Sequence, residues 1–255
     1  MAGAGAGMSG SSDLAFAHRL ADAADAITLA RFGAADLRVE TKPDLTPVSE
    51  ADRDAEEALR ALVASSGRGE GVLGEEFGDD GGDARWIVDP IDGTKSYVRG
   101  VPVWATLLAL ERDGVVVAGL VSAPALARRW WAVRGEGAFA DGVRCRVSSV
   151  ARVEDALVST TSPRELPSGW GQVVARAWAT RGFSDFWQYC LVAEGAVDAA
   201  FEAKLNLWDY AAVALLVEEA GGRCTTFAGA SPAHGESFLA TNDHLHHEVV
   251  SLLRV

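Results

Sequence analysis

The sequence predicts a layered fold of the α+β or α/β class, in which helices sandwich two β-sheets. Short apolar runs separated by glycine follow one another between residues 71 and 144, which is typical of strands that pair with their neighbours. After residue 150, strand-like and helix-like segments alternate, which is typical of a sheet covered by helices. Two helix-like segments precede all of these strands.

The two N-terminal helices are indicated by spacing and capping. Residues 13–33 carry apolar side chains at helical spacing, and Asp13 can cap the start. A second helix is expected over 49–65, where Ser49 is a natural N-cap and Asp52 occupies the capping-box position three residues later.

The later elements follow the same rules. Asp113 and Gly114 predict a hairpin between two apolar strands, and "RWIVDP" reads as a buried strand. The segments expected after residue 150 are strands 156–160, 197–201 and 237–240 and helices 170–180, 185–194, 208–220 and 243–253.

The chain organisation is expected to be simple. The glycine- and alanine-rich start, residues 1–12, lacks the basic and apolar regions of a secretory signal and predicts a disordered tail. Met1 and Met8 both remain candidates for the natural start. The rest, 13–255, is expected to be one domain with an N-terminal half over 13–150 and a C-terminal half over 151–255.

Composition excludes several classes of function. A formal net charge of −13 disfavours a nucleic-acid partner, because such partners require clustered Lys and Arg. No apolar run reaches the roughly 18 residues that a membrane span needs. The three cysteines are widely spaced, which indicates small core residues in a reducing compartment. We expect a cytoplasmic protein that uses neither nucleic acid nor membrane.

The stretch "WIVDPIDGTKSY" ends a buried strand with two acids. Asp89 and Asp92 would repel each other unless a cation lies between them. Pro90 restricts Asp89 to an extended conformation, and the following turn lets Asp92 fold back toward it. The carbonyl of Ile91, between the two acids, could supply a further oxygen.

Other acids beside turns or element ends could complete a metal site. They are Glu75 in "GEE", Asp209 in "WDYAA" and Asp52 in "SEAD". Mg²⁺ takes oxygen ligands and needs no His or Cys. The alternative for any one of these segments is an ordinary acidic turn, since such turns are common. The combination favours a metal site.

Gly93 and Thr94 follow the two acids and are predicted to open a short helix. Free backbone N–H groups and the positive end of the helix dipole would hold a phosphate there. The acids and the turn together therefore predict metal-assisted chemistry on a phosphoryl group.

The chain resembles the inositol monophosphatase-like family, whose larger relatives include fructose-1,6-bisphosphatase. The resemblance covers about residues 15 to 250 and depends on two ordered signatures, which are "WIVDPIDGT" from Trp86 to Thr94 and "WDYAAVALLVEEAGG" from Trp208 to Gly222. The resemblance implies an αβαβα sandwich, a homodimer, and a Mg²⁺-dependent phosphatase acting on a small phosphate ester.

The resemblance also implies roles for the acids. One Mg²⁺ would be bound by Glu75, Asp89 and the Ile91 carbonyl, a second by Asp89, Asp92 and Asp209, and a weaker third near Glu75. In catalysis, Thr94, hydrogen-bonded toward Asp52, would orient the attacking water with help from Glu75. The amides of Gly93 and Thr94 would hold the phosphate.

Within the family, the chain looks most similar to the histidinol-phosphatase branch. "GTKSYVRGVPVW" and "DFWQYCLVAEGAVD" match that branch, and Arg99 stands where the inositol branch usually has His. Glu202, seven residues before Asp209, and Asp185 are the candidates for binding the cationic end of such a substrate. Asp185 could equally be only an N-cap.

Two alternatives remain open at this point. The substrate could be inositol phosphate or another small phosphate monoester. A different class of function is a catalytically silent metal-binding regulator that keeps the fold. Thr94 and Glu75 argue against the silent protein, because a binder would need neither.

Overall fold

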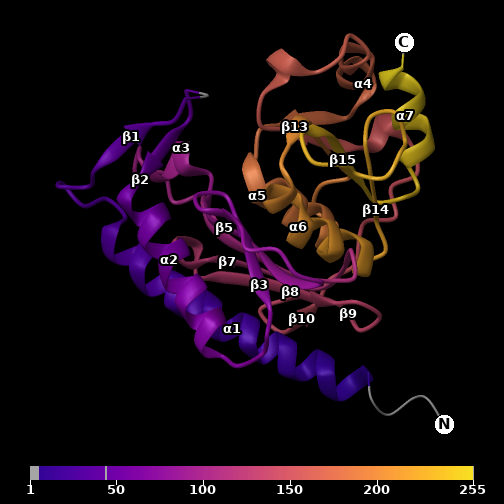
Figure 1. Cartoon of the computed structure of the whole chain (residues 1–255). Helices are drawn as coiled ribbons and strands as arrows, with labels where there is room; N and C mark the ends of the chain where they lie inside the picture. Colours follow the sequence, from indigo (N-terminus) through magenta and orange to yellow (C-terminus); the bar gives the residue numbers. More distant parts are fainter. Residues whose placement is uncertain (1–5, 44, 255) are drawn as a thin grey trace.

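Two β-sheets separated by a pair of helices define the architecture of the computed structural model, which describes residues 6–43 and 45–254 (Figure 1). The first sheet has eight strands in the order β10-β9-β8-β7-β6-β5-β3-β4, and the second has five in the order β12-β11-β13-β15-β14. The first sheet contains β3 Gly71–Gly74, β4 Gly78–Asp79, β5 Ala84–Asp92, β6 Ala105–Arg112, β7 Val115–Ala123, β8 Arg128–Val133, β9 Gly137–Ala140 and β10 Val143–Arg144. The second contains β11 Leu157–Thr160, β12 Ala179–Arg181, β13 Ala199–Leu205, β14 Arg223–Thr225 and β15 Glu236–Thr241.

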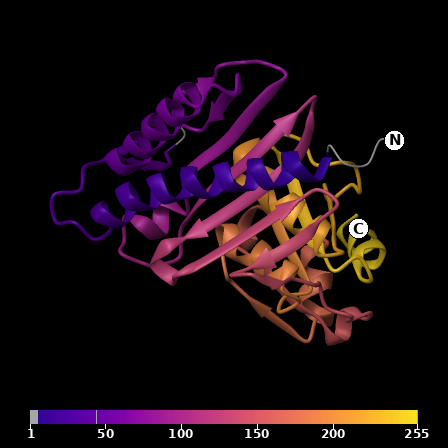
Figure 2. The ribbon, with the colours of Figure 1, turned by 90° about the horizontal axis from the view of Figure 1, so that it is seen from below.

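The helices form the three remaining layers, so the predicted αβαβα sandwich is confirmed. The outer pair on the first sheet packs its apolar side chains on one face, and α1 lies across the strands in Figure 2. α5 and α6 fill the space between the sheets, and α4 and α7 cover the far face of the second sheet. The bounds are α1 Ala6–Arg31, α2 Glu50–Ser65, α3 Thr94–Tyr97, α4 Trp170–Arg176, α5 Asp185–Ala193, α6 Leu207–Glu219 and α7 His246–Leu253.

Several predicted boundaries need correction. α1 begins at Ala6, seven residues before the predicted start at Asp13, and residues 1–5 of the predicted tail lie outside the described residues. The helix predicted over 170–180 ends at Arg176, because Ala179–Arg181 pairs as β12 with β11. None of the helices in the described ranges combines the length and the apolarity needed to cross a membrane.

A one-residue bulge in β5 places the two acids of the first signature on one face. Asp89 pairs with Leu107 and Asp92 pairs with Ala105, so three steps along β5 match two along β6. Residues three apart on a regular strand point to opposite faces, and the extra residue restores the same face. The bulge is braced by Thr106, whose hydroxyl donates to the Pro90 carbonyl at 2.8 Å.

Candidate active site

Strand and helix ends bring the predicted acids to one edge of the first sheet. β3 runs parallel to β5 with Gly74 opposite Val88, so Glu75 follows β3 beside Asp89. Parallel strands end at the same edge of a sheet, which is why these two acids meet. Asp209 lies in the first turn of α6. Asp185 begins α5 in the layer between the sheets.

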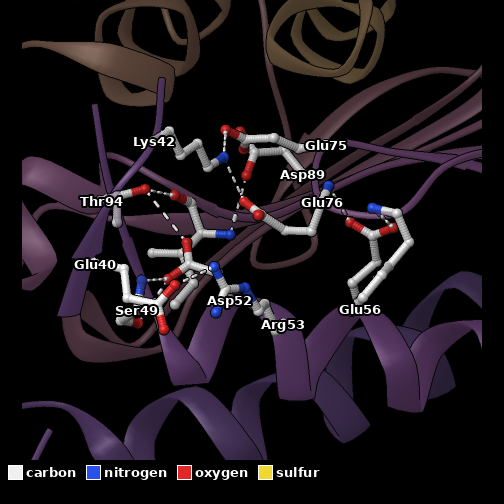
Figure 3. A network of polar contacts seen from close by, with 12 residues as sticks. Glu40, Lys42, Ser49, Asp52, Arg53, Glu56, Glu75, Glu76, Asp89 and Thr94 are labelled. Atoms are coloured by element: carbon white, nitrogen blue, oxygen red, sulfur yellow. Dashed lines mark hydrogen bonds and ion pairs between the residues drawn. The ribbon is translucent and has the colours of Figure 1, made fainter. Parts of the chain in front are cut away.

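Asp52 lies behind these acids in the first turn of α2. Its Oδ2 accepts hydrogen bonds from the Ser49 amide at 2.8 Å and from the Ser49 hydroxyl at 2.6 Å. This confirms the predicted capping arrangement, and it fixes the direction of the carboxylate. The other oxygen, Oδ1, lies 3.3 Å from the Thr94 hydroxyl (Figure 3). The expected contact between Thr94 and Asp52 is therefore present.

Thr94 has a second acceptor in the loop between the two acids. Its hydroxyl lies 3.0 Å from the Ile91 carbonyl, closer than it lies to Asp52. A threonine hydroxyl has one proton and can donate to only one of the two acceptors at a time. The hydroxyl is therefore shared between the loop that carries the acids and the carboxylate of α2.

The turn at Gly93 requires glycine. Its φ is +87°, and a Cβ at this position would lie 3.0 Å from the Val103 carbonyl and 3.3 Å from Asp185 Oδ2. The left-handed conformation turns the chain directly from β5 into α3. The close approach also places the Asp185 carboxylate beside the turn predicted to hold a phosphate.

A lysine that the sequence analysis did not single out lies among the acids. Lys42, from the loop between β1 Val39–Thr41 and β2 Pro47–Ser49, contacts both acids of "GEE" (Figure 3). Its ammonium lies 2.7 Å from Glu75 Oε1 and 2.5 Å from Glu76 Oε1. Nothing in the local sequence pattern distinguishes this lysine, because its partners are more than thirty residues away.

A second missed residue is Glu56, which is fully buried on α2. Its carboxylate accepts the backbone amides of Glu76 at 2.8 Å and Phe77 at 3.1 Å, and Arg60 balances its charge. Each amide hydrogen bond to a buried charge stabilises the loop by about 1.5–3 kcal/mol. Glu56 therefore holds the backbone that carries Glu75.

Burial and mutual repulsion raise the pKa values of the clustered acids. The pKa of Asp89 is well above its usual range because the group is buried and faces Glu75, Asp92 and Asp209. Burial also raises the pKa of Asp92, which faces Asp185 and Asp209. The pKa of Asp209 rises to about 7, chiefly by burial, although its hydrogen bond from Asn206 opposes the shift.

The donor chemistry of this cluster fits a hard divalent cation. Among the described residues, no three carboxylate, imidazole or thiol side chains already converge on one point as ligands. Backbone N–H groups bind two of these acids separately. Asp92 accepts the Phe186 amide, and Asp209 accepts the Asn206 amide at 2.7 Å. Oxygen-only donors that repel one another are the kind of set that Mg²⁺ stabilises.

The two acids predicted to bind the substrate, Asp185 and Glu202, have different surroundings. Asp185 lies beside Gly93 and raises the pKa of Asp92. Glu202, on β13, interacts electrostatically with Asp185, which contributes to the raised pKa of Glu202. Its Oε1 accepts hydrogen bonds from the Thr161 amide and the Gln188 side chain. Glu202 is therefore linked to the cluster through Asp185.

The fold and the site define a phosphatase scaffold, and comparison with known proteins gives its family. The model of the inositol monophosphatase family matches residues 11–254, and the chain belongs to this family.

Relatives within the family are similar over nearly their whole length. A histidinol-phosphatase of Mycobacterium tuberculosis is 52% identical over 94% of this chain and 97% of its own. One from Streptomyces coelicolor is 49% identical over 94% of this chain and 96% of its own. Among solved structures, an IMPase of Thermotoga maritima superposes with a TM-score of 0.89 at 32% identity, covering 95% of this chain and 97% of its own.

Proposed function

We propose that the protein is a Mg²⁺-dependent phosphatase that hydrolyses histidinol phosphate. The observation that carries the proposal is the bulge in β5, which presents Asp89 and Asp92 on one face directly before the Gly93 turn. The 52% identity to a histidinol-phosphatase supports the choice of substrate.

The acids are proposed to hold two or three Mg²⁺ ions. Glu75, Asp89 and the Ile91 carbonyl would hold one, and Asp89, Asp92 and Asp209 a second. A third, weaker ion would lie near Glu75. When bound, such ions activate a water molecule and neutralise charge on the phosphate and the leaving oxygen. Family membership and the oxygen-only donor set support this assignment.

Thr94 and Asp52 are proposed to orient the attacking water. Asp52 Oδ1 is free of the Ser49 contacts and can accept the Thr94 proton. The Thr94 oxygen then offers a lone pair to a water on the side of Glu75, which can assist in removing its proton. The amides of Gly93 and Thr94 would hold the phosphate, since the first amides of a helix have no acceptor within it.

Substrate selection is proposed to depend on acids beyond the metal ligands. Histidinol phosphate carries an ammonium group and an imidazole, and Asp185 and Glu202 offer carboxylates to them. Burial raises the pKa of Glu202, and a cationic group placed against it would favour its charged form. Neutral hydroxyl groups, as in inositol phosphate, would gain less from this surface.

The test is phosphate release from a panel of four substrates, with and without Mg²⁺. The panel contains histidinol phosphate, inositol phosphate, fructose bisphosphate and phosphoadenosine phosphate. Preferred turnover of histidinol phosphate is expected. A preference for inositol phosphate would replace the substrate while keeping the enzyme class. No release from any of them with Mg²⁺ would favour the catalytically silent metal-binding regulator.

A further inference from the structure

Thr161 and Gln188 hold the carboxylate of Glu202. Oε1 accepts the Thr161 amide at 2.9 Å and the side-chain amide of Gln188 at 3.2 Å. The Thr161 side chain also donates to the carboxylate. An ionised carboxylate has about four acceptor positions, so the group can still accept a donor from a ligand, and its direction depends on what holds Oε1.

Gln188 also contacts Ser159 on β11 and, at 3.4 Å, the Thr161 hydroxyl. The Ser159 oxygen accepts the Phe183 amide at 3.2 Å, and its hydroxyl lies 3.0 Å from Gln188 Oε1. The ionised Glu202 carboxylate can only accept, so the amide nitrogen of Gln188 must face it as a donor. Oε1 of the carboxamide then faces Ser159 and accepts its hydroxyl proton.

Both residues of this relay are completely buried. Rotating the Gln188 carboxamide by half a turn would place its oxygen against the Glu202 carboxylate. Two acceptors would then face each other, and the buried carboxylate would lose a donor, which costs free energy. The relay therefore has one stable direction, from Phe183 through Ser159 and Gln188 to Glu202.

We propose that Gln188 is a positioning residue that fixes the Glu202 carboxylate for recognition of a cationic group on the substrate. The inference rests on the proposed function for the identity of that group. Thr161 connects the second acid to the same arrangement, because its hydroxyl accepts the Asp185 amide at 3.0 Å. Gln188 thereby holds one oxygen of the Glu202 carboxylate and leaves the other directed at the ligand.

The kinetic test is a double-mutant cycle on substrate selectivity. The quantity measured is kcat/KM for histidinol phosphate divided by kcat/KM for a small phosphate ester without an amine. Gln188→Met keeps the side-chain volume but removes the three side-chain hydrogen bonds, and it should lower this ratio about tenfold. Glu202→Gln should lower the ratio about tenfold or more, and the double variant should lose no more than Glu202→Gln alone. Multiplied losses in the double variant would overturn the inference.

Controls separate positioning from general damage to the core. Gln172→Met makes the same substitution at an exposed position of α4 and should leave the ratio unchanged. If Gln188→Met fails to fold, Ser159→Ala removes the group that orients the carboxamide and should lower the ratio about threefold to tenfold by the same route. An unchanged ratio in a folded Ser159→Ala variant would count against the relay.

A second readout does not depend on the substrate. In protein with ¹³C-labelled glutamate, the pKa of Glu202 should rise in Gln188→Met, because a donor to the charged form is lost. If wild-type protein shows no preference for histidinol phosphate, the proposed function fails, while a raised pKa would still support Gln188 as the residue that holds Glu202. An unchanged pKa would overturn the inference even if the proposed function holds.

Discussion

Asp89 and Asp92 lie on the same face of β5, although a regular strand would turn them to opposite faces. The shared face brings the two carboxylates together with Asp209 and raises the pKa values of both strand acids. The carboxylates at the end of β5 therefore repel one another, and a bound cation would reduce this repulsion.

Asp92→Asn should abolish most phosphatase activity while the protein remains folded. The amide oxygen of asparagine can still accept the Phe186 N–H, but one ligand charge is lost. We expect at least about a 10²-fold loss of kcat/KM together with a smaller gain of Tm on adding Mg²⁺. Asp155→Asn, at an exposed position, is the matched control. Turnover close to wild type would contradict the two-metal assignment.

Thr94→Ala should lower kcat by about 10²-fold, since the hydroxyl orients the attacking water in the proposed mechanism. Thr94→Ser keeps a hydroxyl that can reach Asp52 Oδ1 and should retain most activity. The Mg²⁺ concentration for half-maximal activity should be similar in all three proteins. If metal binding collapses in Thr94→Ala while kcat at saturating Mg²⁺ survives, Thr94 supports the metal site instead.

Lys42→Gln should lower the Mg²⁺ concentration needed for half-maximal activity. The ammonium of Lys42 contacts Glu75 and Glu76 and opposes a second positive charge at the same place. Removing it should strengthen cation binding by about threefold to tenfold. Lys204→Gln provides a control at an exposed lysine. A weaker response to Mg²⁺ in Lys42→Gln would mean that Lys42 is needed to shape the site.

Without metal, the protein should lose stability as the pH rises from 6.5 to 8. The pKa of Asp209 is raised to about 7 in the folded state, so the folded state binds the proton more tightly than the unfolded state does. The stability contributed by that proton is complete below the unfolded pKa and is lost as the pH rises through about 7.

The expected loss in this window is about 1 kcal/mol, or roughly 2–4 °C in Tm for a chain of this size. The window starts at 6.5 because His246 acts in the opposite direction at lower pH. Burial lowers its pKa to about 4, and it destabilises the fold as the pH falls below its ordinary value. Thermal unfolding in a chelator should show the trend, and Asp209→Asn should flatten it. A Tm that rises over this interval in wild type would refute the assignment.

Local sequence alone was enough to predict the acid-rich segment at the end of β5 and the capped start of α2. Asp89, Asp92 and Gly93 are adjacent in the chain, and their chemistry follows from an apolar run that ends in acids and a glycine. The capping role of Asp52 toward Ser49 was also visible, because it depends on a spacing of three residues. Such features depend on residues only a few positions apart, so side-chain type and backbone preference are enough to predict them.

The tertiary structure decided the groups that surround this segment. Lys42 meets Glu75 across thirty-three positions, and Gln188 meets Glu202 across fourteen. Whether a lysine or glutamine lies on a surface or beside an acid depends on how sheets and helices pack. The neighbouring residues in the sequence do not predict that position. The sequence by itself determined which residues could bind metal and phosphate, and only the packing of the layers determined which groups hold, neutralise and direct them.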